Sequence, residues 1–281
     1  MKKTTLIITL LLFVVTLSSC KKDGIYDPKG KIDKIYYEYN SRKYLAEDWT
    51  CEKDYLKNIS YYDADGDLES TDYFTYRSDK RLLQVDNLIK NESMKYNYDN
   101  RHNLIKASHT VNGILSTLYE FEYDDNELSD IHITVYESAD FNAKNTSNPL
   151  RYLLPETSLK SISKILKDSP SRGEQKIEID LDWEGKNVTE LELQMKNYSE
   201  EYIFEYDNKS NPFRDFLGLS FEESLFEHGI FTSKNNITKY IVTETSYDAS
   251  ETDVEIISYT YDGKLPVTRN HGGVTEYFEY E

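Results

Sequence analysis

The residues that could do chemistry in this chain are few and dispersed. The five histidines stand at positions 102, 109, 132, 228 and 271, and no pattern of a metal site or a catalytic pair connects them. The sequence also lacks G-x-S-x-G, H-E-x-x-H, the P-loop pattern and G-x-G-x-x-G. With 51 acidic residues, some carboxylates must face each other by chance, so no catalytic pair can be selected. We therefore expect a protein that is not an enzyme.

The histidines themselves fit structural positions. His132 alternates with Ile131 and Ile133, which indicates the polar face of a strand. His109 follows a similar strand pattern. His102 falls in a turn, where His is among the residues that tolerate a left-handed backbone. These positions favour solvated or turn histidines over metal ligands.

One short segment has the residues of a cation site. Asp63, Asp65 and Asp67 alternate around Gly66, and Glu69 follows them. The EF-hand pattern places its Gly one position after the third acidic ligand and a Glu at the twelfth position, and neither condition is met. A solvated hairpin tip is the favoured interpretation, with a calcium site formed by the three aspartates as the alternative. No other metal and no cofactor is expected.

The elements that must position these residues are hairpins built on one repeated turn. Four segments of equal length begin with Tyr and end with Leu: Tyr39–Leu45, Tyr62–Leu68, Tyr76–Leu82 and Tyr98–Leu104. An Asp or Asn after the Tyr can accept a hydrogen bond from a backbone N–H two residues on, and Gly66 fits the left-handed position of a type I turn with a bulge. The alignment predicts left-handed backbones, each at a cost of about 1 kcal/mol relative to Gly, at Lys43, Lys80 and His102.

Alternating strand patterns extend over nearly all the rest of the chain and predict one antiparallel all-β domain over residues 32–281. No Pro-, Gly- or Ser-rich linker divides it. The expected strands are 32–39, 44–50, 55–62, 68–76, 82–90, 94–98, 104–111, 115–123, 128–136, 159–166, 177–183, 188–195, 202–206, 237–245, 254–261, 267–270 and 274–280.

The N-terminus has the order of an export signal: Met1-Lys2-Lys3, an apolar run, and Leu17-Ser18-Ser19-Cys20. The last four residues resemble the lipobox of bacterial lipoproteins, which implies cleavage before Cys20 and acylation of its thiol. Residues 1–19 are then the signal peptide and residues 20–31 a lipidated tether. Because no Asp follows Cys20, the resemblance favours an outer-membrane anchor, with the domain facing either the periplasm or the medium. An ordinary signal peptide with an incidental Cys20 is the alternative.

The charge of the mature chain limits its partners. Removal of the signal leaves 33 minus 2, or 31, basic residues against 51 acidic ones, a net charge of −20. Such a surface repels phosphate, so nucleic acid is not an expected partner. With Cys20 acylated, Cys51 is the remaining thiol, and no intramolecular disulfide is expected.

The tandem Tyr-Asp turns resemble the YD repeats of bacterial surface and toxin-shell proteins. Together with the lipobox, Asn211-Pro212-Phe213 and Lys234-Asn235-Asn236-Ile237-Thr238, they make the chain similar to a Bacteroidetes lipoprotein domain of unknown function with a porin-like fold. The resemblance covers residues 32–281. It implies a strongly curved antiparallel sheet or a partly closed barrel, and it implies no activity.

Three functions fit these observations. The first is a non-catalytic cell-envelope lipoprotein that acts as a binding or scaffold module for a protein or glycan partner, because Tyr-rich sheets offer rigid amphipathic surface. The second is a surface glycan-binding or glycan-processing lipoprotein, for which the candidate contact residues are Trp49 and Tyr152. The third is a carrier of an apolar ligand within the curved sheet.

Two segments interrupt the hairpins in a similar way. Residues 148–154 and 211–217 share Asn-Pro, a large apolar residue, Arg, and two further large side chains. Pro149 and Pro212 suit the first turn of a short helix. We expect these insertions to pack on the concave face of the sheet as part of its core, with an exposed apolar docking patch as the alternative.

Overall fold

A computed structural model describes residues 30–53, 55–125, 127–136, 174–213, 233–246 and 249–281, and these residues form seventeen strands and no helix. The strands are β1 (Ile32–Tyr39), β2 (Arg42–Glu52), β3 (Tyr55–Tyr62), β4 (Leu68–Tyr76), β5 (Leu82–Asn87), β6 (Glu92–Tyr98), β7 (Leu104–Val111), β8 (Ile114–Asp124), β9 (Glu127–Val135), β10 (Gln175–Glu184), β11 (Asn187–Met195), β12 (Tyr198–Tyr206), β13 (Ile237–Ser246), β14 (Ala249–Ile256), β15 (Ser258–Asp262), β16 (Leu265–His271) and β17 (Val274–Tyr280).

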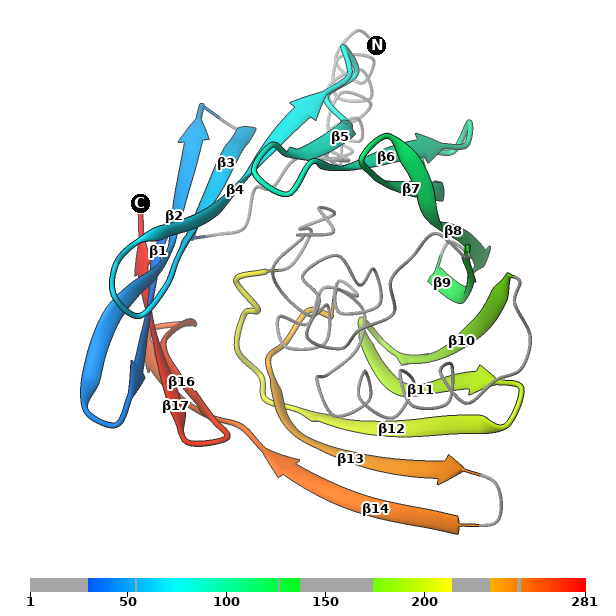
Figure 1. The fold of residues 1–281 in the computed structure, drawn as a ribbon. Helices are drawn as coiled ribbons and strands as arrows, with labels where there is room; N and C mark the ends of the chain where they lie inside the picture. The colour runs from blue at the N-terminus through cyan, green and yellow to red at the C-terminus, as the bar shows by residue number, and fades with distance from the viewer. Residues whose placement is uncertain (1–29, 54, 126, 137–173, 214–232, 247–248) are drawn as a thin grey trace, which may run out of the picture.

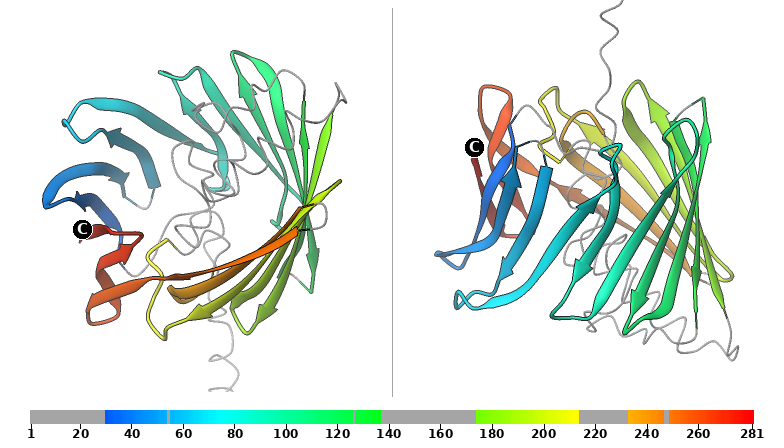
Figure 2. Two further views of the ribbon diagram at one scale, coloured as in Figure 1. Left: turned by 60° about the horizontal axis from the view of Figure 1, so that its bottom comes forward. Right: turned by 90° about the horizontal axis from the view of Figure 1, so that it is seen from above.

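The strands form one strongly curved antiparallel sheet that is nearly closed into a barrel (Figure 1). Among the described residues, each strand pairs with the next along the chain, except that β14 and β15 are not paired with each other, and β17 returns to pair with β1. The strands tilt around a common axis (Figure 2). The predicted all-β fold is confirmed, and five expected strands coincide with β1, β3, β4, β7 and β17. The predicted helical insertions lie mostly outside the described residues.

An antiparallel meander places alternate turns at opposite ends of its strands. The terminal rim holds both ends of the described chain, Gly30 and Glu281, and the turns that follow β2, β4, β6, β8, β10, β12 and β15. The distal rim holds the turns that follow β1, β3, β5, β7, β11 and β16.

The repeated turn is confirmed in three of its four copies. Tyr62, Tyr76 and Tyr98 each pair with the Leu six residues later, and each pairing follows a register shift. Gly66, Lys80 and His102 have φ values of 88°, 73° and 78°, and each donates its N–H to the carbonyl three residues before it. The left-handed residue and its backbone hydrogen bond therefore produce one turn geometry from different sequences, and in two of the copies the side chain after the Tyr, Asp63 or Asp99, also accepts backbone N–H groups of the turn.

The fourth copy is wrong, and so is its left-handed Lys43. Tyr39 pairs with Arg42, so the turn closes over two residues, Asn40 and Ser41, with φ values of 51° and 63°. Asn readily adopts this conformation, which matches the twist of a two-residue hairpin. Leu45 consequently pairs with Tyr36 on the preceding strand.

Aromatic side chains close the sheet along the terminal rim. Six aromatics donate a hydrogen bond to a backbone carbonyl of another strand. Five of them lie near the end of a strand and reach the start of the strand before it, and Tyr259, near the start of β15, reaches the start of β13. The pairs are Tyr76 to Leu56 (2.9 Å), Tyr123 to Leu104 (3.0 Å), Trp183 to Leu128 (2.7 Å), Tyr206 to Val188 (2.5 Å), Tyr259 to Ile237 (2.9 Å) and Tyr280 to Pro266 (2.6 Å). The aromatics of the repeat thus satisfy carbonyls at the point where the bulges interrupt the ladders.

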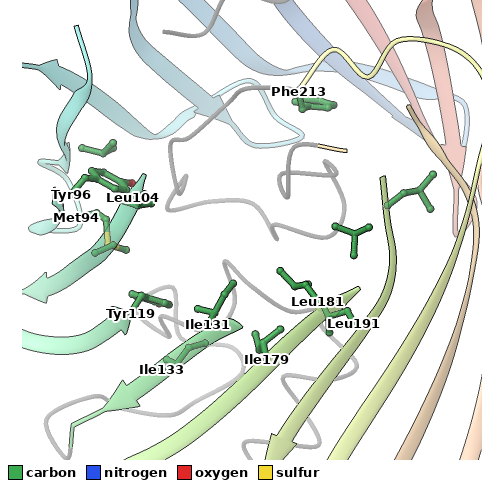
Figure 3. Close-up of a cluster of buried hydrophobic side chains, with 14 of the residues drawn as sticks. Met94, Tyr96, Leu104, Tyr119, Ile131, Ile133, Ile179, Leu181, Leu191 and Phe213 are labelled. Carbon is green, nitrogen blue, oxygen red and sulfur yellow. The ribbon is translucent and has the colours of Figure 1, made fainter. Parts of the chain in front are cut away.

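The core lies on the concave face of the sheet (Figure 3). Its side chains come from alternate positions of successive strands, such as Ile131, Ile133 and Ile179, each at most 1% exposed. Phe213, at the start of the second insertion, belongs to the same cluster, with its ring 6.1 Å from Trp49 and 6.0 Å from Phe278. Residues 137–173 and 214–232 lie outside the described residues, so the predicted packing of the two insertions stays a prediction beyond Phe213.

Candidate binding surface on the distal rim

The structure uses the aspartates of the candidate calcium site for other contacts. Asp63 accepts hydrogen bonds at one oxygen from the backbone N–H of Asp65 (2.9 Å) and of Asp67 (2.8 Å). The carboxylate of Asp65 pairs with Arg42 at 2.9 Å. Within the described ranges, no group of three or more His, Cys, Asp and Glu side chains is arranged to hold a metal ion. These contacts support the hairpin-tip interpretation.

Trp49, proposed above as an exposed glycan contact, lies inside the sheet. Its side chain is 3% exposed, and its indole N–H donates a 2.6 Å hydrogen bond to Glu47. The alternating pattern predicts a strand but does not show which face of the strand is buried. The predicted exposure of Trp49 is wrong for this reason. Tyr152 and Cys20 lie outside the described residues.

His109 and His132 lie on opposite faces of the sheet. His132 lies on the outer face, 3.3 Å from Glu122, as predicted. His109 is buried on the concave face with its Nε2 3.5 Å from Glu92, so its strand position is confirmed but it does not face solvent.

The turn between β5 and β6 displays two aliphatic side chains. The expected strand over 82–90 stops at Asn87, and Leu88 and Ile89 form the turn with 73% and 60% of their side chains exposed. The buried side chain of Asn87 explains the stop, because its Oδ1 accepts the backbone N–H of Lys90 at 3.0 Å while its Nδ2 donates to Asp72 at 2.9 Å. The interior of the sheet therefore fixes the conformation of this turn.

The turn between β7 and β8 lies beside it and is hydrogen-bonded to it. Asn112 and Gly113 have φ values of 52° and 76°, as a two-residue Asn-Gly hairpin requires. The N–H of Asn112 donates to the carbonyl of Asn91 at 2.9 Å, and the Asn91 amide donates to the Asn112 side chain at 2.8 Å. The two turns thus form one unit.

This unit carries four exposed aliphatic side chains. Leu88 and Ile89 stand on its first turn, and Ile114 and Leu115, 60% and 37% exposed, stand just after its second. We call these four residues the distal apolar tips. The expected strands include Leu88, Ile89 and Leu115 and leave Ile114 between two strands, so the strand pattern does not reveal this surface. The signals that could have found them are the Asn-Gly pair at 112–113 and the Lys-Asn pair after Ile89.

The motifs that carried the family resemblance come together on the terminal rim. Asn211 donates its amide to the carbonyl of Ser233 at 3.1 Å, and its N–H to the carbonyl of Lys234 at 3.1 Å. Asp207 accepts the backbone N–H and the side-chain amide of Asn236, both at 3.1 Å. These bonds join the two ends of the second insertion, which gives the motifs a structural role. No helix long and apolar enough to cross a membrane occurs in the described part of the chain.

No protein-family model matches the sequence, and no curated protein matches it significantly. Among solved structures, the fold is similar to that of a porin-like protein from Bacteroides uniformis ATCC 8492, with a TM-score of 0.51, 13% identity, and coverage of 89% of this chain and 98% of that one. It is also similar to a porin-like protein from Bacteroides vulgatus ATCC 8482, with a TM-score of 0.51, 8% identity, and coverage of 90% and 99%. The structure of TcdB2-TccC3-Cdc42 matches with a TM-score of 0.30, 14% identity, and coverage of 84% and 12%. The two porin-like structures confirm the expected fold.

Proposed function

We propose that this protein is a non-catalytic lipoprotein of the bacterial cell envelope and that its domain is a binding module. The distal apolar tips carry this proposal. Fully burying an exposed aliphatic side chain of this size is worth about 1.5–3 kcal/mol, so Leu88, Ile89 and Ile114, each at least 60% exposed, gain stability when a partner covers them.

The tips are also fixed in place before any partner binds. The side chains of Asn87, Asn91 and Asn112 hold the two turns through hydrogen bonds. A surface that is already ordered loses less conformational entropy on binding than a flexible loop would.

The orientation of the domain suits this role. The described chain begins at Gly30 on the terminal rim, and the tips lie on the opposite rim. A lipid on Cys20 would attach through a tether of at most about 40 Å. The tips would then point away from the anchoring membrane.

The other two functions have less support. A glycan site loses its candidate Trp49, which is buried. An apolar ligand carrier needs accessible concave surface, whereas inward side chains such as Tyr119, Ile177 and Leu191 are at most 1% exposed. We therefore favour contact with a protein partner.

Photo-crosslinking tests the binding surface. A photoreactive amino acid replaces Ile89 or Ile114 in cells that make the full chain. The matched controls are Leu83 and Ile105, which lie on β5 and β7 and are each 41% exposed, but away from the tips. We expect one discrete adduct from the tip positions and none from the controls. Equal crosslinking at all four positions, or none, would contradict the proposal.

Metabolic labelling with palmitate tests the lipid anchor. We expect Cys20→Ser to abolish labelling and release the protein from the membrane fraction. Cys51→Ser is the control, because the thiol of Cys51 lies on a strand within the domain. Unchanged labelling of Cys20→Ser would refute lipidation at this residue. Proteinase treatment of intact cells then distinguishes the medium from the periplasm.

A further inference from the structure

Strand β14 has one paired edge and one open edge. From Ala249 to Ile256 it pairs with β13 along its whole length. The chain then passes through Ile257 into β15, which pairs with β16 on its other side. Among the described residues no register of paired residues involves the second edge of β14, and Figure 1 shows this strand at the outer border of the lower part of the sheet.

The open edge is accessible and long enough to accept a strand. Every residue of β14 is exposed except Glu255, which is half-buried. Glu255 lies 3.2 Å from His271, the last residue of β16, so the open edge extends from Ala249 to Val254. Six residues span about 20 Å, the usual length of a strand in a globular protein.

The two faces of β14 differ in chemistry. Glu251, Asp253 and Glu255 alternate on one face. On the other face, Val254 and Ile256 are 53% and 69% exposed. Val254 is opposite Ile241 on β13, which is opposite Ile203 on β12, itself 44% exposed. The open edge is therefore acidic on one face and borders an exposed aliphatic row on the other.

This pattern disfavours a second copy of the same chain. Antiparallel self-pairing centred on Thr252 would place Glu251 opposite Asp253, and pairing centred on Asp253 would place Glu251 opposite Glu255. Like charges directly opposite each other destabilise a sheet. Charges on an edge strand also protect it from random pairing. Both effects vanish for a basic partner strand.

We propose that the open edge of β14 binds an extended basic segment of a partner protein as an added strand. Lys or Arg at alternate positions would face Glu251, Asp253 and Glu255, and apolar residues between them would extend the row of Val254. This inference does not depend on the distal apolar tips, which lie on other strands.

A peptide in which Lys alternates with Val tests the proposal. Its affinity for the mature protein is measured by fluorescence anisotropy. The comparison peptide has the same sequence but is N-methylated at alternate residues. This modification keeps the charges of the peptide and removes backbone N–H donors. We expect roughly tenfold weaker binding of the N-methylated peptide, and a loss of similar size with the double variant Glu251→Lys and Asp253→Lys. The denaturation midpoint of the variant checks that it folds.

The matched control is the double variant Glu192→Lys and Glu201→Lys, which reverses the same charge on β11 and β12, where both strand edges are paired. We expect it to bind the peptide as the wild type does. Equal binding of both peptides, equal losses in both double variants, or dimerisation of the wild type through β14 in a crosslinking assay would each overturn the proposal.

Discussion

The two rims of the sheet are built from the same hairpins but end them differently. On the terminal rim, aromatic side chains donate hydrogen bonds to carbonyls of neighbouring strands, as Tyr123 does to Leu104 and Tyr206 to Val188. On the distal rim between β5 and β8, the turns are held by asparagines and leave aliphatic side chains in solvent. The aromatic hydrogen bonds therefore stabilise the terminal rim, and the distal rim between β5 and β8 can carry a binding surface.

The largest expected effect comes from breaking the packing of the terminal rim. Phe213→Ala should lower the free energy of unfolding by about 3–5 kcal/mol, because Phe213 is 4% exposed and contacts Trp49 and Phe278. Chemical denaturation measures the loss. The same loss for Phe216→Ala, outside the described residues, would extend the core prediction to the rest of the insertion. A Phe213→Ala variant of wild-type stability would contradict this account of the rim.

A smaller loss should follow from removing the support of the distal turn. Asn87→Ala deletes the hydrogen bonds to Asp72 and to the N–H of Lys90, at a cost of about 1–3 kcal/mol. It should also weaken crosslinking from Ile89, because the turn is no longer fixed. Lys90→Ala, which keeps the backbone donor, is the control and should change neither measurement. Unaltered crosslinking in Asn87→Ala would show that the tip needs no internal support.

The tyrosine hydroxyl groups of the terminal rim should make the stability of the fold depend on pH in the alkaline range. Burial raises the pKa of Tyr123 and of Tyr206 from 10.0 to about 12. Because the pKa is higher in the folded state, the neutral hydroxyl stabilises the fold fully below pH 10, and this contribution is lost as the pH rises through about 12. Tyr206→Phe should cost about 1 kcal/mol at pH 8 and make stability fall less steeply between pH 10 and 12.

Tyr39→Phe is the control for this measurement, because Tyr39 is 57% exposed at the distal end of β1. Its denaturation midpoints should follow those of the wild type at every pH. If the stability of Tyr206→Phe and that of the wild type fall equally steeply between pH 10 and 12, the hydroxyl groups of the terminal rim do not stabilise the fold.

The hairpin turns could be predicted from the sequence because their conformation depends on residues within each turn. The distal apolar tips and the buried face of β2 depend on contacts with other strands. The turns at Lys80 and His102 follow from residues within each turn. The conformation of the first distal turn depends on Asn87, whose side-chain amide donates a hydrogen bond to Asp72 on the neighbouring strand. The alternating pattern of residues 82–90 does not predict that hydrogen bond. Which face of β2 turns Trp49 inward likewise depends on the curvature of the whole sheet.

The smallest expected effect is a gain of stability at the repeated turn, which both rims use. His102 has a φ of 78° where the matching turn on the distal rim has Gly66 at 88°. A side chain costs about 1 kcal/mol in this region, so His102→Gly should raise the free energy of unfolding by about that amount. Lys80→Gly, with a φ of 73°, should gain similarly. Lys43→Gly is the matched control: it lies within β2, where Gly weakens a strand, and it should destabilise the domain. If His102→Gly lowers the denaturation midpoint instead, the contacts of the imidazole outweigh its backbone strain, and the turns of the two rims are less alike than their backbones indicate.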